Sequence, residues 1–253
     1  MKIPALLSLP HCAVEIPLWL KERIVLKQNE IVDSVDRGSE EVFCAMPVFS
    51  VIKAKWSRLV VDLNRKPDSF GKKGVVARTD YQGREIYLAA GYPGKDEIEK
   101  LVQTYYNPFH EEILRALANP AVEALFDCHS LEGTGPSDAP DTGEKRRDII
   151  LSNNGDYKGR VDAKRGYITC SVERLALIKK AFHNQGFSVA INSPYRGGFI
   201  TQHYGKQLMT RGKFAVQIEM NQDLILSSGR NVLNNEKIKS VQERVLSAMT
   251  EIF

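Results

Sequence analysis

The sequence predicts an α/β sandwich built on one mainly parallel or mixed sheet. Short apolar runs alternate with amphipathic stretches along the 253 residues, which is the order expected when strands and helices follow one another. The apolar runs are typical of strands that helices cover on both faces. Because no internal repeat or change in composition divides the chain, we expect a single domain over residues 1–253.

Seven short apolar runs are the predicted strands. The run Leu59–Leu63 contains the β-branched pair Val60 and Val61, and the other six have a similar length and apolar character. In chain order the predicted strands are Ala5–Leu9, Val48–Lys53, Leu59–Leu63, Ala121–Asp127, Asp148–Leu151, Ser188–Ile191 and Phe214–Ile218.

Three longer stretches are the predicted helices. Lys95–Leu117 carries apolar residues at a spacing close to 3.6, the helical repeat. Ser171–Asn184 begins with a serine suited to N-capping, and Gly186 follows its end, where helices often terminate. Asn235–Ile252 is amphipathic and is the last helix.

Two long segments and one short helix complete the expected organisation. Ser39 is expected to cap a helix that runs through Met46. Lys66–Tyr81 and Ser130–Glu144 are predicted loops that each follow a predicted strand. Loops of this length in a folded domain are usually functional or mobile, and α/β folds place their sites at strand ends.

Composition excludes several classes of protein. Hydrophobic residues make up 43% of the chain and charged residues 26%, which is ordinary globular usage and not that of a disordered chain. No apolar run approaches the ~20 residues that span a bilayer, so we expect no membrane association. The net charge of +4 comes from scattered basic residues, so we expect no nucleic-acid partner.

The cysteines and the first residues bear on location. Four cysteines without a Cys-x-x-Cys pair favour a reducing compartment. The first ten residues lack the long apolar region of a signal peptide. We therefore expect a cytoplasmic protein, either a monomer or a small homo-oligomer.

Two histidines follow predicted strands. His11 comes after Ala5–Leu9, and His129 comes after Ala121–Asp127. Since strand ends of an α/β sheet share one edge, the two imidazoles can meet there and begin a zinc site with an open position for water. The alternative is that each histidine only caps its strand by hydrogen bonding. The candidates for an acidic third ligand are Glu15, Asp36, Glu40 and Glu41.

Further candidates supply a base and anion recognition. Glu219 follows the strand Phe214–Ile218, where a carboxylate beside a metal-held water would be a general base; otherwise it is a solvated strand end. Arg65 and Arg196 lie in loops and can grip a carboxylate, unless each pairs with an aspartate such as Asp62.

Several short motifs in this order resemble the N-formylglutamate amidohydrolase (N-formylglutamate deformylase) family. Together they run from residue 9 to residue 219 and so cover most of the chain. The motifs are Leu9-Pro10-His11, Val61-Asp62-Leu63-Asn64-Arg65, Tyr106-Asn107-Pro108-Phe109-His110, Asp127-Cys128-His129-Ser130, Asn192 to Gly198 with His203-Tyr204-Gly205, and Gln217-Ile218-Glu219.

The resemblance implies a fold and a reaction. The family is similar to zinc carboxypeptidases and aspartoacylases, which implies a three-layer sandwich with a central mixed sheet flanked by helices. The implied reaction is hydrolysis of an N-formyl or similar N-acyl acidic amino acid, such as N-formylglutamate, to the free amino acid and formate. The implied cofactor is one Zn²⁺ per chain.

The resemblance also implies roles for particular residues. The zinc ligands become His11, His129 and Glu40, because the family's Thr-Asp dipeptide aligns with Ser39-Glu40. Glu219 becomes the catalytic base. The substrate-binding residues become Asn64, Arg65, Arg196 and His203.

Three alternatives stay open from the sequence. One is a carboxypeptidase-like or aspartoacylase-like zinc hydrolase of another acyl-amino acid or peptide. The second is a non-catalytic module that binds an amino acid. The third is a cysteine nucleophile at Cys12 or Cys128, each next to a histidine, although neighbouring strand residues point to opposite faces.

Overall fold

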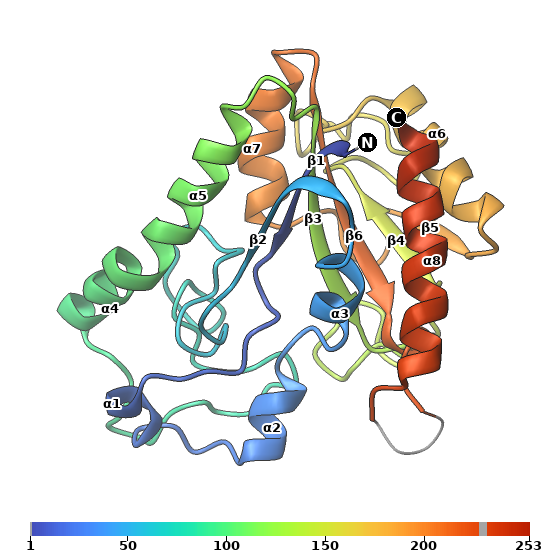
Figure 1. The fold of residues 1–253 in the computed structure, drawn as a ribbon. Coiled ribbons are helices and arrows are strands. Elements are labelled where there is room, and N and C mark those ends of the chain that lie inside the picture. Colours follow the sequence, from blue (N-terminus) through green and yellow to red (C-terminus); the bar gives the residue numbers. More distant parts are fainter. Residues whose placement is uncertain (1, 228–231) are drawn as a thin grey trace.

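A six-stranded mixed sheet forms the centre of the computed structural model, which describes residues 2–227 and 232–253 (Figure 1). The strand order is β2-β1-β3-β6-β4-β5. The first four of these strands are mutually parallel, β4 runs antiparallel to β6, and β5 is parallel to β4. The strands are β1 (Ile3–Leu9), β2 (Val48–Lys53), β3 (Ala124–Leu131), β4 (Ile149–Ser152), β5 (Val189–Ile191) and β6 (Phe214–Asn221).

One face of the sheet carries an apolar core. Alternate residues of β3 and β6, such as Phe126 and Val216, are fully buried there. They pack with residues of α3 (Ser39–Phe43), α6 (Val172–Asn184) and α8 (Asn235–Ile252). These helices lie together on one side of the sheet (Figure 1).

The opposite face carries a second core and a row of polar residues. Leu125 and Ala215 pack with the second core, which includes residues of α4 (Lys95–Leu101), α5 (Asn107–Leu117) and α7 (Phe199–Met209). Further along the same face, every second residue of β3 and β6 becomes polar. These residues are Asp127, His129, Gln217 and Glu219, and all four are buried.

Helices on both faces of a mixed sheet confirm the predicted fold class. The predicted strand Val48–Lys53 agrees with β2. Five other predicted strands match observed ones with shifted ends. The largest shift is at β3, which continues through His129 to Leu131, so His129 lies within a strand.

The predicted strand Leu59–Leu63 is wrong. The segment has no partner strand among the described residues and folds as turns, with the Val60 amide donating to the Ser57 carbonyl at 2.9 Å. Its apolar side chains are buried because they fill the second core. Burial alone therefore explains the apolar run, and the turns deliver Asp62 and Asn64 to the carboxyl end of the sheet.

The predicted helices form, with local corrections. Lys95–Leu117 is helical throughout, and its middle segment, η1 (Val102–Tyr106), is a π-helix between α4 and α5. Ser171 caps α6 and accepts a hydrogen bond from the Arg174 amide. Ser39 does not cap α3, because Gly38 takes that position in a left-handed conformation and Ser39 instead donates to the Asp36 carbonyl.

The helix α7 and three short helical segments were not predicted from the sequence. These segments are α1 (Leu18–Lys21), α2 (Gln28–Asp33) and the 3₁₀ turn η2 (Gln222–Leu224). In α7 the residues toward the protein interior include Thr201 and Gly205, which are not strongly apolar. The apolar periodicity that marks other helices is therefore weak there.

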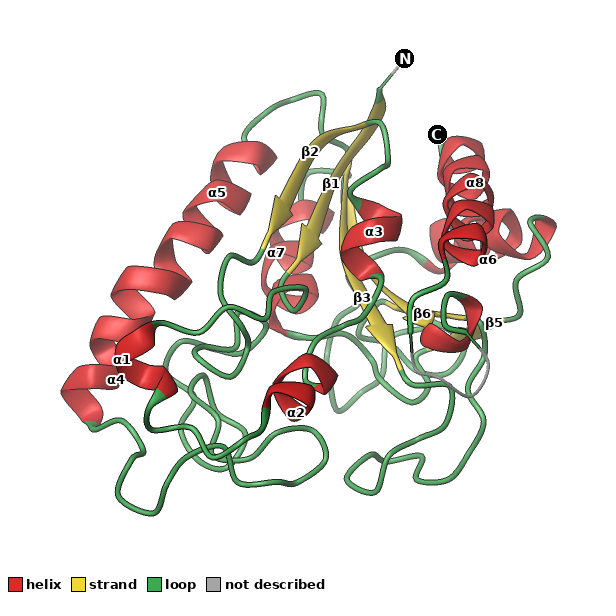
Figure 2. Cartoon of the chain, turned by 60° about the horizontal axis from the view of Figure 1, so that its bottom comes forward, coloured by secondary structure: helices red, strands yellow, loops and turns green. Residues whose placement is uncertain are grey.

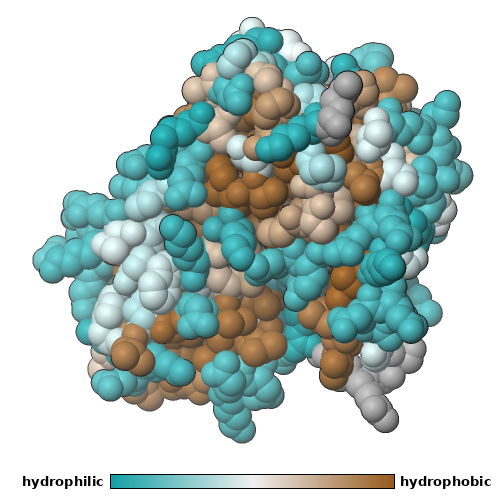
Figure 3. All heavy atoms as spheres, viewed as in Figure 1, coloured by the Kyte–Doolittle hydropathy of each residue, from teal (hydrophilic) through white to brown (hydrophobic). Residues whose placement is uncertain are grey.

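One face of the molecule mixes hydrophilic and apolar areas (Figure 3). Figure 3 shows hydrophilic residues over much of one face, with apolar areas between them. In the described part of the chain, no helix is long and apolar enough to cross a bilayer.

Candidate active site

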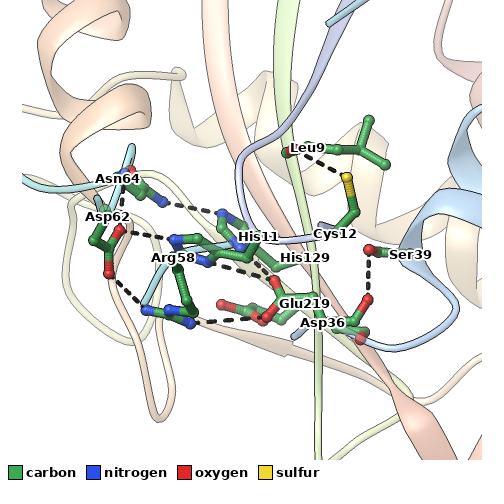
Figure 4. A network of polar contacts seen from close by, with 12 residues as sticks. Leu9, His11, Cys12, Asp36, Ser39, Arg58, Asp62, Asn64, His129 and Glu219 are labelled. Atoms are coloured by element: carbon green, nitrogen blue, oxygen red, sulfur yellow. Dashed lines mark hydrogen bonds and ion pairs between the residues drawn. The ribbon is translucent and has the colours of Figure 1, made fainter. Parts of the chain in front are cut away.

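His11, Asp36 and His129 converge at the carboxyl ends of β1 and β3 (Figure 4). The imidazole centres of His11 and His129 lie 4.9 Å apart. The Asp36 Oδ2 atom lies 2.7 Å from Nδ1 of His129 and 3.6 Å from Nδ1 of His11. One ligand atom from each of the three residues lies within 4.8 Å of the others. The histidines that the sequence predicted to meet are therefore brought together.

The far nitrogen of each imidazole faces a different carboxylate. Nε2 of His11 lies 2.8 Å from Asp62, and Nε2 of His129 lies 3.2 Å from Asp127. Carboxylates in this position fix the orientation of metal-binding histidines and make the ring a better ligand. Both rings thus direct Nδ1 toward Asp36 and hold Nε2 in an ion-pairing position.

Asp127 is fully buried and is held by three side chains. It accepts hydrogen bonds from Ser8 at 2.9 Å, from the Asn64 amide at 3.0 Å and from Thr201 at 3.1 Å. These donors come from β1, the turn after Leu63, and α7. Three separate elements therefore fix the carboxylate that orients His129.

Arg58 lies beside the two other carboxylates of the site. Its guanidinium donates to Asp62 at 2.8 Å and lies 3.9 Å from Asp36. Burial of the Asp62 carboxyl opposes its ionisation, but Arg58 and His11 hold the pKa of Asp62 well below its usual range. Asp62 therefore stays charged and can pair with His11.

Glu219 extends from β6 directly beside His129 of β3. Its side chain is buried, and the Gln217 amide donates to one carboxylate oxygen at 2.8 Å. Burial raises the pKa of Glu219 to about 7, despite the nearby His129 charge. The arrangement places a proton-exchanging carboxylate next to the histidine cluster.

The residues of the cluster fit a catalytic metal ion. Two imidazole nitrogens and one carboxylate form a donor set that catalytic zinc sites use, and such a site keeps a further position for water. The acidic member in this structure is Asp36, one of the four acids that the sequence left open. The candidate metal site is therefore His11, Asp36 and His129.

Glu40 is not brought to the histidines, so the ligand set implied by the resemblance needs this correction. Its carboxylate pairs with Lys53 at the end of β2, and its side chain is 41% exposed. Glu40 lies in the first turn of α3, whereas Asp36 precedes the left-handed Gly38 that starts the helix. That turn directs Asp36 toward the cluster.

A cavity of about 530 Å³ opens over this cluster. Its lining includes the three metal-site residues, Glu219 and Arg58, together with Asn64, Arg65 and Arg196. The loops predicted to be functional also line it and join each other, because Tyr81 donates to Glu132 at 2.8 Å and Lys73 pairs with Asp138. Figure 2 shows the strand ends facing these loops.

His203 is not among the residues that line the cavity, and its contact with substrate stays a prediction. It is exposed on α7 and stacks on Phe199, with ring centres 4.9 Å apart. Thr201 and Gly205 of the same helix face inward, which turns His203 outward.

Asn64 and Arg65, two other predicted substrate residues, differ in whether their polar groups are still available to a ligand. The Asn64 amide group is already used, since it donates to Asp127 and accepts from the Ile200 amide at 2.8 Å. Arg65 lines the cavity, and its Nε lies 3.7 Å from Asp62, which is already bound by Arg58 and His11. Asn64 therefore holds Asp127 in place, whereas the charge of Arg65 remains largely available to a ligand.

Neither cysteine beside a histidine is suited to be a nucleophile. The Cys12 thiol donates to the Leu9 carbonyl at 3.5 Å, and burial raises its pKa to about 12. Cys128 points into the apolar core on the other face of β3 from His129, and burial raises its thiol pKa. Both thiols stay protonated near neutral pH.

A comparison with known protein families shows to which family the chain belongs. The model of a family described as N-formylglutamate amidohydrolase matches residues 3–226. The chain belongs to the N-formylglutamate amidohydrolase family. This membership confirms the family that the sequence motifs resembled, and it confirms a hydrolase that acts on an amide bond.

Two relatives have similar sequences over most of their length. N-formylglutamate deformylase of Pseudomonas aeruginosa is 26% identical over 233 residues, covering 87% of this chain and 81% of the relative. N-formylglutamate deformylase of Pseudomonas putida is 23% identical over 261 aligned positions, covering 99% of this chain and 92% of the relative.

Solved structures share the fold of this N-formylglutamate amidohydrolase family member. N-formylglutamate amidohydrolase from Ralstonia eutropha JMP134 superposes with a TM-score of 0.76 at 16% identity, over 99% of this chain and 94% of that one. A gene product of Agrobacterium tumefaciens superposes with a TM-score of 0.65 at 17% identity, over 98% of this chain and 89% of that one.

Proposed function

We propose that the chain is a zinc-dependent amidohydrolase that hydrolyses an N-formyl or similar N-acyl acidic amino acid, such as N-formylglutamate. The products are the free amino acid and formate, or the corresponding acid. The observation that supports this most strongly is the cluster of His11, Asp36 and His129 beside Glu219 in one cavity. The relatives named N-formylglutamate deformylase support the substrate class.

His11, Asp36 and His129 would hold one divalent cation, with zinc the metal most suited to this donor set. When bound, such an ion supplies Lewis acidity and lowers the pKa of a water ligand toward ~7. Asp62 and Asp127 keep the two imidazoles in the orientation that binding needs.

Glu219 is the general base and then the general acid. It accepts a proton from the attacking water as the water oxygen bonds to the formyl carbon. It then gives that proton to the amide nitrogen as the carbon–nitrogen bond breaks. Its place beside His129 and its burial in the cavity suit both steps, because solvent has little access to the transferred proton.

Arg58 faces the same cavity and is suited to stabilise the charge that develops on the carbonyl oxygen. Its guanidinium is fixed by Asp62, so it is oriented before substrate binds. A donor of this kind is worth a few kcal/mol of barrier in other hydrolases, because it needs no reorganisation during the reaction.

Arg65 binds the carboxylate on the carbon that carries the scissile amide. It follows Asn64, which contacts both Asp127 and His129, so it lies close to the reacting carbonyl. Binding of that carboxylate positions the carbonyl and lowers the barrier by orientation.

We keep the predictions of a cytoplasmic protein and of a monomer or small homo-oligomer.

Parallel assays test the substrate class. We expect formate release from N-formylglutamate by the zinc-loaded protein, with slower hydrolysis of N-acetylglutamate or N-acetylaspartate and of dipeptides. Faster cleavage of an acetyl amino acid or of a peptide would favour an aspartoacylase-like or carboxypeptidase-like hydrolase. Binding without hydrolysis of any of these compounds would favour a non-catalytic amino-acid-binding module.

A further inference from the structure

The arginines of the cavity differ in how far the protein already neutralises them. Arg196 forms an ion pair with Asp162 and lies over the Tyr157 ring, 5.0 Å from its centre. Arg146 is almost fully buried and is held by both carboxylate oxygens of Asp141 at 2.7 Å. Each of these two charges therefore has an internal partner and is less available to a ligand.

Arg165 also lines the cavity, and the carboxylate that its charge acts on, Asp162, already pairs with Arg196. Nη1 of Arg165 donates to the neutral Asn154 side chain at 2.7 Å. Within the described residues, its guanidinium forms no close ion pair. A guanidinium that lines a cavity without a close ion pair, and with one nitrogen anchored, is suited to bind a carboxylate from outside.

Asn154 holds Arg165 in this place. Its backbone is left-handed, with φ of 66°, a conformation that asparagine adopts more readily than most residues. Its amide side chain donates to the Tyr167 carbonyl at 2.9 Å, and its backbone amide donates to the Arg196 carbonyl at 2.8 Å. One residue thus ties the loop that carries Arg165 to the loop that carries Arg196.

The two available arginines lie at different places relative to the reaction centre. Arg65 reaches Asp62, which contacts His11 of the metal cluster. Arg165 contacts Asn154, and among the described residues neither of them bonds to a metal-site residue or to Glu219. A carboxylate next to the scissile amide must lie near the cluster, whereas one at the end of a side chain must lie further away.

We infer that Arg165 binds the side-chain carboxylate of an acidic N-acyl amino acid, and that Asn154 is the residue that positions it. The assignment rests in part on the proposed function, because it takes Arg65 as the partner of the main-chain carboxylate. The chemical class of ligand is then a dicarboxylate, and Arg165 is the residue that distinguishes it from a neutral analogue.

The first test compares R165Q with K164Q. Lys164 is the neighbouring exposed residue of the same loop and does not line the cavity, so K164Q removes the same charge without the contact. For R165Q we expect the ratio of kcat/KM for N-formylglutamate to that for N-formylglutamine to fall roughly 10–100-fold, mainly through KM. K164Q should keep the wild-type ratio.

The second variant, N154G, tests positioning. Glycine keeps the left-handed backbone and removes the side chain that anchors Arg165. We expect the same ratio to fall by less than in R165Q, again through KM and with kcat unchanged. An equal loss for both substrates in N154G, or a change confined to kcat, would contradict the positioning role.

A binding measurement separates this inference from the proposed reaction. Calorimetric titration of the wild type with L-glutamate and L-glutamine should show a preference for glutamate that R165Q loses and K164Q retains. This result would support Arg165 even if no N-acyl compound were hydrolysed, an outcome that would refute only the proposed function. Equal binding of the two amino acids by the wild type, or an unchanged preference in R165Q, would overturn the inference.

Discussion

His129 and Glu219 are partner residues in the parallel pairing of β3 with β6. Partner positions in a parallel sheet point to the same face, so the metal-site histidine and the proposed base lie side by side because of the strand register. A shift of one residue would turn one of them into the apolar core beneath the sheet. The geometry of the site is thus determined by the most buried part of the fold.

Asp36 and Glu40 should differ sharply in their effect on metal content. D36N removes a ligand charge from the cluster, and we expect zinc affinity to fall at least ~100-fold. E40Q removes only the partner of Lys53 and should retain zinc. Elemental analysis after dialysis against a weak chelator measures both proteins, and loss of zinc from E40Q with retention in D36N would restore the ligand set implied by the family resemblance.

E219Q should separate chemistry from metal binding. The amide has nearly the same shape but cannot accept the water proton, so we expect kcat to fall by about 10²–10⁴. The zinc content should match that of the wild type, because Glu219 is not a member of the cluster. Near-wild-type turnover in zinc-replete E219Q would show that another group is the base.

Gly198 should tolerate no side chain. A Cβ at this position would lie 2.4 Å from the Asn64 amide nitrogen, which donates to Asp127. For G198A we expect the free energy of unfolding to fall by roughly 1–3 kcal/mol and turnover to fall roughly 10–100-fold as Asn64 shifts. G94A is the matched control, since the nearest atom to its Cβ is 4.0 Å away. Equal denaturant midpoints for the two variants would contradict the crowding at Asn64.

His110 should make stability depend on pH. Its Nε2 faces the Leu63 carbonyl at 3.0 Å, and its Nδ1 faces the Tyr204 hydroxyl at 2.8 Å, an arrangement that suits the neutral ring. Burial lowers the pKa of His110 to about 4. The unfolded chain takes up the proton near pH ~6.5, so stability should be lost as pH falls from ~6.5 toward 4, by at most about 3 kcal/mol.

H110Q provides the comparison for this pH effect, since glutamine can also donate to Leu63 and accept from Tyr204. Urea unfolding in the presence of a chelator should give a shallower loss of stability for H110Q than for the wild type between pH 6.5 and 4. Parallel curves for the two proteins would mean that other groups cause the acid sensitivity.

Most of the fold could be predicted from local patterns. The runs that became β1, β2 and β6 are short and apolar because both faces of these strands are covered. Leu59–Leu63 has a similar composition but pairs with no strand in the described part of the chain, and no local sequence pattern shows whether a partner strand exists. The helix α7 was not predicted, because its buried residues mix apolar ones with Thr201 and Gly205, which are not strongly apolar.

The site could be predicted in part. His11, His129 and Glu219 were recognisable because polar residues follow apolar strands. Selecting Asp36 over Glu40 required the direction of the turn at Gly38, which sequence spacing does not show. The aspartates that orient the histidines, Asp62 and Asp127, were signalled by single acids inside apolar runs, but their roles depend on contacts between distant segments.

Strand direction reverses between β6 and β4. The residues that line the cavity therefore come from two regions, one at the ends of the parallel strands and one at the connections beyond the reversal. Of the metal-site histidines, His129 lies on the parallel strand β3 and His11 follows the parallel strand β1. Arg165 and Arg196 come from the connections after β4 and β5. Insertions or exchanges in those connections would alter which molecules are admitted without moving the metal ligands. We therefore expect proteins of this fold that differ in substrate to differ mainly in the connections after β4 and β5.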